Sequence, residues 1–255
     1  MTNQQNQKKV YFVSDCHFGV PNHEQSLERE KLFISWLDLI KKDASELYIM
    51  GDLFEFWFEY KTVVQKGYVR LLGKLAEISD AGIPVYFFRG NHDVWAFDYL
   101  AEELGFIIYP DTLIREMNGK KFFLGHGDGL GKGDNGYKFL KRVFRNKVNQ
   151  FLFRWLHPDI GTRMGRFWSN KSRVANINQG IEQVNDEGIE RITGYCNQKL
   201  QQHPDIDYFV FGHIHRPQVT DLEGKAKYYS IGDWIHHYSY LTFDGENLSH
   251  QYFLK

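Results

Sequence analysis

Five short clusters of Asp, His and Asn side chains are the most informative feature of the chain. They occur at residues 15–17 (DCH), 51–55 (GDLFE), 90–93 (GNHD), 125–128 (GHGD) and 212–215 (GHIH). Carboxylate oxygens, amide oxygens and imidazole nitrogens together suit divalent metals such as manganese, iron and zinc. Because every cluster contains at least one such donor, the sequence predicts a metal site, with a pair of ions as the favoured form.

Each cluster follows, directly or after one intervening residue, a run of apolar residues that is short enough to be a buried strand. These runs are residues 10–13, 47–50, 85–88, 122–124 and 208–211. Open α/β sheets carry their binding sites at the carboxyl ends of strands. The predicted strands would therefore deliver metal donors repeatedly to the place where such a sheet holds its site.

A purely structural explanation exists for each cluster taken alone. An Asp after a strand could cap a helix, a Gly could serve only a turn, and a single His could be a buried structural residue. Five clusters of one chemistry in equivalent positions are poorly explained by five unrelated structural roles. The metal interpretation is therefore preferred.

The remaining pattern predicts alternating strands and helices, followed by hairpins. Apolar residues at helical spacing predict helices over residues 27–40, 68–78 and 97–104. The dipeptide Asn118-Gly119 between two strand-like runs predicts a tight hairpin. Further turns near the C-terminal end lead us to expect a parallel first sheet and a mainly antiparallel second one.

Composition limits the class of protein. A chain of 255 residues can form one α/β domain with a large core. A net charge of −1 gives no overall attraction to nucleic acid, and the two cysteines form no C-x-x-C pair. Residues 1–9 are polar and resemble no secretory signal, and no apolar run is long enough for a membrane span. We therefore expect a cytoplasmic protein.

The clusters, in this order, resemble the motifs of the calcineurin-like metallophosphoesterases: D-x-H, G-D-x-x-[DE], G-N-H-[DE], G-H and G-H-x-H. The resemblance implies a four-layer αββα sandwich in the α/β class. It implies one metal position held by Asp15, His17, Asp52 and His215. It implies a second position held by Asp52, Asn91, His126 and His213, so that Asp52 bridges the two ions.

The same resemblance implies hydrolysis at phosphorus. Paired ions stabilise both the attacking and the leaving oxygen of an in-line displacement. His92 would face the phosphoryl oxygens or the leaving group as a donor or acid, which makes His92 and Asp52 the candidate catalytic residues. Manganese is the first expectation for both ions, with iron or zinc as alternatives.

A long insertion separates the fourth cluster from the fifth. Residues 132–173 contain 11 Lys or Arg and two acidic residues, and they are rich in aromatic side chains. Apolar residues recur at steps of three and four from Tyr137 to Trp155, which predicts an amphipathic helix. An ordinary surface helix is one interpretation, and a membrane-binding segment or a cap over an amphiphilic anion is the other. We therefore divide the chain into a tail (1–9), a core (10–131 and 201–255) and a helical lid insertion (132–200).

Several longer motifs resemble the UDP-2,3-diacylglucosamine pyrophosphatases of lipid A synthesis. These are GDLFEFW at 51–57, HGDGL at 126–130, SRVAN at 172–176, GHIHRP at 212–217 and GDW at 232–234. The resemblance implies cleavage of UDP-2,3-diacylglucosamine to UMP and 2,3-diacylglucosamine 1-phosphate at the inner-membrane surface, with the lid over the acyl chains. Its candidate substrate contacts are Asn91, Asp134, Tyr137, Lys171, Ser172 and Arg173.

One departure leaves the exact substrate open. His92 stands where well-studied members of that group carry Arg. The alternatives are a metallophosphoesterase for another nucleotide, a phosphodiester or a nucleic acid, and a non-catalytic scaffold of the same fold. In the favoured interpretation, the protein binds an amphiphilic sugar-nucleotide lipid as its substrate. We expect it to bind no nucleic acid and to need no obligate protein partner.

Overall fold

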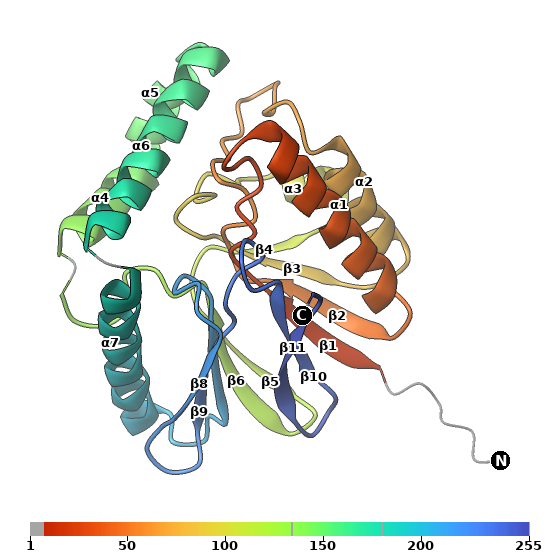
Figure 1. The fold of residues 1–255 in the computed structure, drawn as a ribbon, viewed down its shortest axis with the longest axis vertical. Helices are drawn as coiled ribbons and strands as arrows, with labels where there is room; N and C mark the ends of the chain where they lie inside the picture. Colours follow the sequence, from red (N-terminus) through yellow and green to blue (C-terminus); the bar gives the residue numbers. More distant parts are fainter. Residues whose placement is uncertain (1–7, 134, 180, 255) are drawn as a thin grey trace.

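The structure is a computed structural model that describes residues 8–133, 135–179 and 181–254, without the side chains of residues 170–185. Its strands form two sheets (Figure 1). The first sheet has the order β11 (Leu248–Tyr252), β10 (Ser239–Phe243), β1 (Lys9–Val13), β2 (Ala44–Ile49), β3 (Val85–Phe88) and β4 (Ile107–Tyr109). The second has the order β5 (Leu113–Met117), β6 (Lys120–Gly125), β7 (Tyr208–Phe211), β9 (Lys227–Ser230) and β8 (Gln218–Asp221).

Alternating side chains of the strands build the layers, as strand β1 illustrates. Tyr11 and Val13 belong to the hydrophobic cluster formed with helices α1 (His23–Ile40), α2 (Val69–Asp80) and α3 (Tyr99–Leu104). Val10 and Phe12 point the other way, into the cluster shared with the second sheet. Each face of the strand is therefore buried against a different layer.

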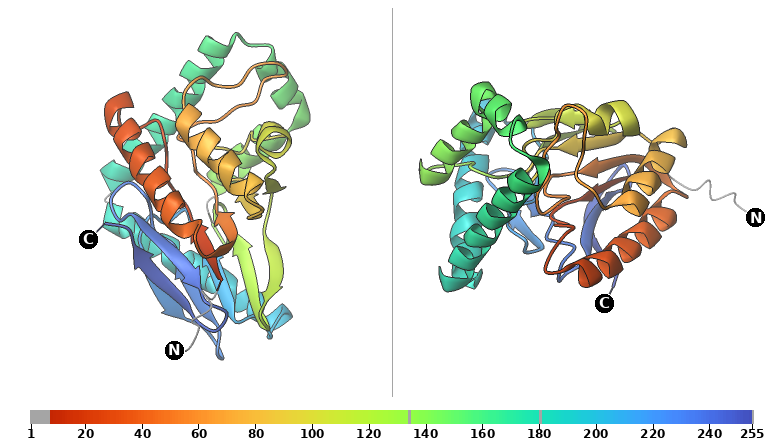
Figure 2. Two further views of the ribbon diagram at one scale, coloured as in Figure 1. Left: turned by 90° about the vertical axis from the view of Figure 1, so that its right-hand side faces the viewer. Right: turned by 90° about the horizontal axis from the view of Figure 1, so that it is seen from above.

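The outer face of the second sheet is covered by helix α7 (Ile181–Gln202) (Figures 1 and 2). Ile192 and Cys196 of this helix share a cluster with Phe209 of β7. Helices, two facing sheets and a further helix thus form the four layers of the predicted α/β sandwich, and that prediction is confirmed.

The predicted hairpin is also confirmed. Asn118 and Gly119 have φ values of 48° and 74°, the left-handed conformations that a two-residue hairpin turn requires at both central positions. Strands β5 and β6 pair on either side of it, with Met117 opposite Lys120.

The predicted strand arrangement is wrong in two respects. The second sheet is not mainly antiparallel, because β7 pairs parallel with both β6 and β9. Helix α7 returns the chain before β7, and such a crossover is what parallel pairing requires. In addition, the C-terminal strands β10 and β11 extend the first sheet, where β10 lies antiparallel to β1.

The lid insertion begins with helices α4 (Asn135–Arg145), α5 (Lys147–Arg154) and α6 (Pro158–Gln179), which lie together at one end of the molecule (Figure 1). The prediction of one helix from Tyr137 to Trp155 is wrong, because the helix is interrupted at Asn146 and continues as two separate helices, α4 and α5. The Asn146 side chain accepts hydrogen bonds from the N–H groups of Val148 and Asn149 at 2.9 and 3.2 Å. Such bonds start a new helix.

Within the described residues, no helix combines the length and the apolar character needed to cross a bilayer.

Candidate metal centre

The carboxyl ends of β1, β2, β3, β6 and β7 bring the five clusters together, with Asp52 in the middle. Its Oδ2 atom lies 3.6 Å from Nε2 of His17 and 3.3 Å from Nε2 of His126. These two histidines come from different sheets. Asp52 therefore stands where one carboxylate can serve two neighbouring groups of donors.

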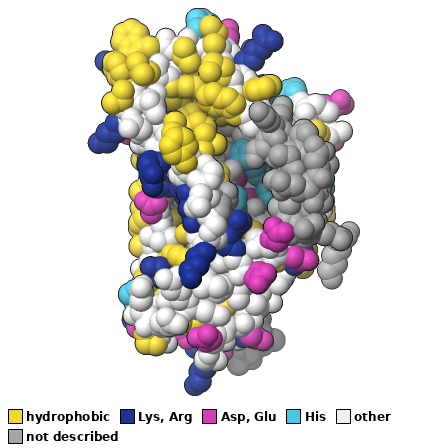
Figure 3. Space-filling model, turned by 90° about the vertical axis from the view of Figure 1, so that its left-hand side faces the viewer, with side chains coloured by type: hydrophobic (Ala, Val, Ile, Leu, Met, Phe, Trp, Pro, Cys, Tyr) yellow, Lys and Arg dark blue, Asp and Glu magenta, His cyan; other side chains and the backbone are white. Residues whose placement is uncertain are grey.

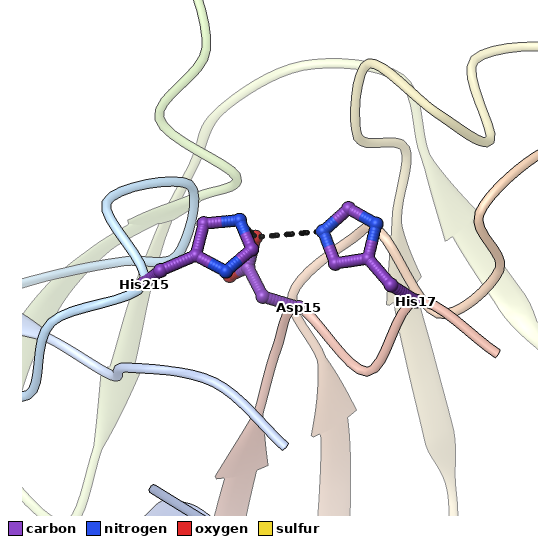
Figure 4. A group of neighbouring side chains, drawn as sticks. All are labelled: Asp15, His17 and His215. Atoms are coloured by element: carbon purple, nitrogen blue, oxygen red, sulfur yellow. Dashed lines mark ion pairs between the residues drawn. The ribbon is translucent and has the colours of Figure 1, made fainter. Parts of the chain in front are cut away.

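The first group consists of Asp15, His17 and His215 (Figure 4). Oδ1 of Asp15 lies 3.8 Å from Nε2 of His17 and 3.5 Å from Nε2 of His215. The three donor atoms lie within 4.8 Å of one another. With Asp52 beside them, these residues could hold one cation.

The second group consists of Asp52, His126 and His213, again with donor atoms within 4.8 Å of one another. Asn91 joins it, because its Oδ1 atom lies 3.2 Å from Nε2 of His126. The structure thus brings together all seven predicted donors, in the two sets that the sequence motifs imply. Their service as ligands remains a prediction.

The chemistry of the first group fits a cation. Oδ1 of Asp15 and Nε2 of His17 are buried, and neither makes a hydrogen bond to any described residue. A buried carboxylate oxygen without a partner is costly. A divalent cation would supply the missing partner to both atoms, so the residues present fit the ion that the motifs imply.

The electrostatics of the centre also favour a bound cation. Burial alone would lower the pKa of His17, but the carboxylates of Asp15 and Glu55 raise this pKa to about 10. The pKa of His126 is also raised to about 10, because the charge of Asp52 outweighs burial. The buried carboxylates therefore attract positive charge, which protons or metal cations can provide.

The ring nitrogens that face away from the centre have partners of their own. Nδ1 of His17 lies 2.9 Å from Oε2 of Glu55, and Nδ1 of His126 lies 2.8 Å from the carbonyl oxygen of Met50. A proton on each Nδ1 leaves Nε2 available to a metal. Such outer partners fix the orientation and tautomer of metal-binding histidines.

The backbone around the centre has unusual dihedral angles and is closely packed. Asp15, His17, Asp52, His213 and His215 all have φ values between 44° and 70°, a left-handed conformation that is costly for these residues and that clusters at functional sites. A Cβ atom added to Gly51 would lie 2.6 Å from Nδ1 of His126, and one added to Gly90 would overlap the Asp52 carboxylate.

His92 stands beside the two groups of donors. Its Nδ1 atom lies 2.8 Å from the carbonyl oxygen of Glu55, and its Nε2 atom lies 4.0 Å from Oδ2 of Asp52. Burial lowers the pKa of His92 below its ordinary value. With Nδ1–H donating to the carbonyl, Nε2 is the end of the ring that faces the centre.

A pocket opens from His92 toward the lid. It is lined on one side by Asn91, His92 and Glu55 and on the other by Trp95, Tyr137, Leu140, Phe144, Trp168 and Ser169, among others. The space-filling view shows histidines in a hollow below the hydrophobic end of the molecule (Figure 3). Polar and apolar surfaces therefore meet at the candidate centre.

The predicted substrate contacts have different outcomes. Asn91 and Tyr137 line the pocket, and the Tyr137 hydroxyl donates to Oδ2 of Asp128 at 2.5 Å. Asp134 lies outside the described residues. Lys171, Ser172 and Arg173 lie on α6, but their side chains are outside what the structure describes.

Sequence reasoning gave no role to three residues that support the centre. Glu55 holds His17, and it is the last residue of the G-D-x-x-E motif, so the motif itself could have drawn attention to it. Asp233 lies 3.4 Å from Nδ1 of His215 and is the Asp of the GDW motif. Ser169 touches Glu55 and His92, and no motif quoted from the sequence contains it.

Comparisons with known proteins show the family to which the chain belongs. The calcineurin-like phosphoesterase family matches residues 8–217. A UDP-2,3-diacylglucosamine hydrolase of Porphyromonas gingivalis is 35% identical over 94% of this chain and 95% of its own length. A protein of the same name from Yersinia pseudotuberculosis is 29% identical over 83% of this chain and 84% of its own. The E. coli phosphoesterase Yfce has 19% identity and a TM-score of 0.45, over 96% of this chain and 93% of its own. The chain is a hydrolase that belongs to the calcineurin-like phosphoesterase family.

Proposed function

We propose that the protein hydrolyses the pyrophosphate bond of UDP-2,3-diacylglucosamine and releases UMP and 2,3-diacylglucosamine 1-phosphate. The observation that carries this proposal is the pocket in which His92 and Asn91, a candidate metal donor, meet the apolar side chains of the lid. A substrate with a pyrophosphate at one end and two acyl chains at the other matches both surfaces. The relatives named for this substrate, which match over most of the chain, support the same assignment.

Two divalent cations complete the active site, one for each group of donors. Manganese is our first candidate, with iron and zinc as alternatives that the same donors would accept. When bound, such ions neutralise the phosphoryl oxygens and stabilise the charge that develops during an in-line displacement. The buried carboxylates Asp15 and Asp52 would hold the ions, and Asp52 lies where it could serve both groups of donors.

His92 acts on the phosphoryl group. Its Nδ1–H donates to the Glu55 carbonyl, so the ring is oriented with Nε2 toward the centre. Burial keeps the resting ring neutral, so Nε2 would first take up a second proton, which the charges of Asp52 and Glu55 favour, and would then pass it to a phosphoryl oxygen or to the leaving group. His92 and Asp52 are therefore the proposed catalytic residues, and Asn91 is both a metal donor and a substrate contact.

The insertion 132–200 serves as a lid on the core formed by residues 10–131 and 201–255. Aromatic side chains fix it to the core: Trp95 lies 5.0 Å from Phe144 and 4.9 Å from Phe153 between ring centroids. The last helix of the insertion, α7, joins the lid to the core, because it also forms the outer layer over the second sheet, where its Ile192 packs. Tyr137 lines the pocket, and Asp134, Lys171, Ser172 and Arg173 remain proposed substrate contacts.

Three cations on α4 have contacts that favour this role over binding of a nucleic acid. Lys141 pairs with Oδ2 of Asp128 at 2.5 Å, and Arg145 pairs with Oδ1 of Asp111 at 2.6 Å. Lys138 donates to the carbonyl oxygen of Gly131 at 2.5 Å. These groups fasten α4 to the core, which leaves them less available to a phosphate backbone.

The outer face of the lid contacts the cytoplasmic surface of the inner membrane. Trp155 is 77% exposed and Val148, Phe151 and Leu152 are 59–63% exposed. They belong to α5 and the residue after it, at the end of the molecule (Figure 1) where Figure 3 shows hydrophobic side chains gathered. Exposed Lys147 lies beside them on α5. Apolar side chains next to cations suit an anionic lipid surface.

The decisive experiment compares kcat/KM on UDP-2,3-diacylglucosamine, on its deacylated form, and on diacylated forms with shorter chains. Each buried methylene contributes up to about 0.8 kcal/mol, so kcat/KM should fall steeply as the chains shorten. Equal kcat/KM on the diacylated and deacylated compounds would rule out the lipid substrate and leave a phosphoesterase of another specificity.

A further inference from the structure

Helix α6 approaches the loop after β2 through small residues at a spacing of four. Gly161, Gly165 and Ser169 are all buried on the side that faces this loop. A Cβ atom on Gly165 would overlap the ring of Phe56, and one on Gly161 would overlap the hydroxyl of Tyr60. The helix therefore lies as close to the loop as a backbone allows.

The third residue of this series reaches the metal centre. The Ser169 hydroxyl donates to Oε1 of Glu55, and its oxygen lies 3.0 Å from Nδ1 of His92. Oε2 of the same Glu55 carboxylate accepts from Nδ1 of His17. One hydroxyl of the lid is thus linked to a candidate metal ligand and to the candidate acid.

We propose that Ser169 is a positioning residue through which helix α6 holds Glu55 and His92 in the orientation that the reaction needs. The hydroxyl gives the buried Glu55 carboxylate a donor from the lid, and a hydrogen bond to a charged group is stronger than one between neutral groups. The lid is then a part of the catalytic centre as well as a cover. This proposal rests on the phosphoesterase assignment and is independent of the lipid substrate.

The test uses the intact metal-loaded protein and bis-p-nitrophenyl phosphate, a small diester that needs no acyl site. Ser169→Ala should lower kcat by about 10- to 100-fold, the effect of one lost hydrogen bond to a charged group, with little change in KM. Ser169→Thr keeps the hydroxyl and should retain most of the activity. Ser35→Ala, which removes an exposed helix serine on α1, is the matched control and should have no effect.

A double-mutant cycle separates positioning from a general effect on packing. If Ser169 acts through His92, Ser169→Ala should cost little further activity in a His92→Ala background, because residues that act as a unit are not additive. Three outcomes would overturn the proposal. The first is a wild-type kcat in Ser169→Ala, the second is full additivity of the Ser169→Ala and His92→Ala effects, and the third is a Ser169→Thr variant as impaired as Ser169→Ala.

Two further measurements do not depend on the loaded enzyme. In the metal-free protein, the Nδ1–H proton of His92, which donates to the Glu55 carbonyl, should give a slowly exchanging NMR signal. Ser169→Ala should shift this signal and speed its exchange, and Ser169→Thr should leave both unchanged. Gly165→Ala should weaken the same signal by pushing α6 away from Phe56. Gly136→Ala on α4, where a Cβ has open space, should leave it unchanged. An unchanged His92 signal in Ser169→Ala would overturn the proposal, whereas failure to cleave UDP-2,3-diacylglucosamine would affect only the proposed substrate.

Discussion

Oδ2 of Asp15 accepts a hydrogen bond of 2.8 Å from the backbone N–H of His213, which lies 198 residues further along the chain. Asp15 follows β1 in the first sheet, and His213 follows β7 in the second. Oδ1 of the same carboxylate faces His17 and His215. A single side chain therefore ties the edges of the two sheets together and presents an oxygen to the first group of donors.

Asp52 should be the ligand whose loss removes most metal. Its carboxylate lies between the two groups, so Asp52→Ala should abolish hydrolysis and prevent stable binding of both ions. Asp15→Ala is the comparison, since it removes a donor from one group only and should retain more metal. Metal analysis after dialysis against manganese decides the matter, and two equivalents retained by Asp52→Ala would contradict a shared ligand.

His92→Ala should separate catalysis from metal binding. Loss of one acid or electrostatic donor lowers kcat by about 10²- to 10³-fold. Metal content should stay near the wild-type value, because the seven donors of the two groups do not include His92. Parallel measurements of kcat and bound manganese test this, and a loss of metal together with activity would make His92 a ligand or a structural residue.

The sequence was sufficient to predict which side chains gather in the centre. Each donor cluster follows a buried strand, and the carboxyl ends of parallel strands meet at one edge. Five short apolar runs followed by metal-donor side chains therefore indicated the strands and the location of the centre, whereas the four-layer fold was implied by the family resemblance. The clusters also contain the small residues that their close packing requires. Gly90, for example, leaves room for the Asp52 carboxylate.

Other features depend on contacts that no local pattern contains. The run at 240–243 reads equally well as a strand of either sheet, and only its packing against β1 decides. The break at Asn146 interrupts an apolar periodicity that continues on both sides, because a local side-chain cap outweighs the pattern. Ser169 acquires its partners only when α6 lies across the loop after β2.

Gly90 tests the close packing of the centre. An added Cβ would overlap the carboxylate of Asp52 and approach its backbone nitrogen to 2.6 Å. Gly90→Ala should therefore destabilise the protein by about 1–3 kcal/mol, the usual cost of overpacking, and lower the bound metal. Thermal unfolding and metal analysis measure the two effects.

Gly73 is the matched control for this substitution. It lies exposed on α2, where an added Cβ meets no atom within 4 Å. Gly73→Ala should stabilise the protein by about 0.4–1 kcal/mol, because alanine loses less conformational entropy in a helix. Equal unfolding temperatures for the two variants would contradict the role given to Gly90.

The exposed apolar face of α5 should direct the protein to anionic membranes. Replacing both Phe151 and Trp155 by Glu removes two large apolar side chains and adds negative charge, so binding to anionic vesicles should weaken at least about tenfold. Turnover of bis-p-nitrophenyl phosphate should not change, since neither side chain lines the pocket. Leu39→Glu, at a residue 47% exposed on α1, is the control and should bind vesicles like the wild type.

Binding of the wild type should also decrease as salt rises, because screening weakens the contribution of Lys147 and its neighbours. Vesicle sedimentation at two salt concentrations measures both effects, and equal binding by the α5 double variant and the wild type would place the membrane contact elsewhere.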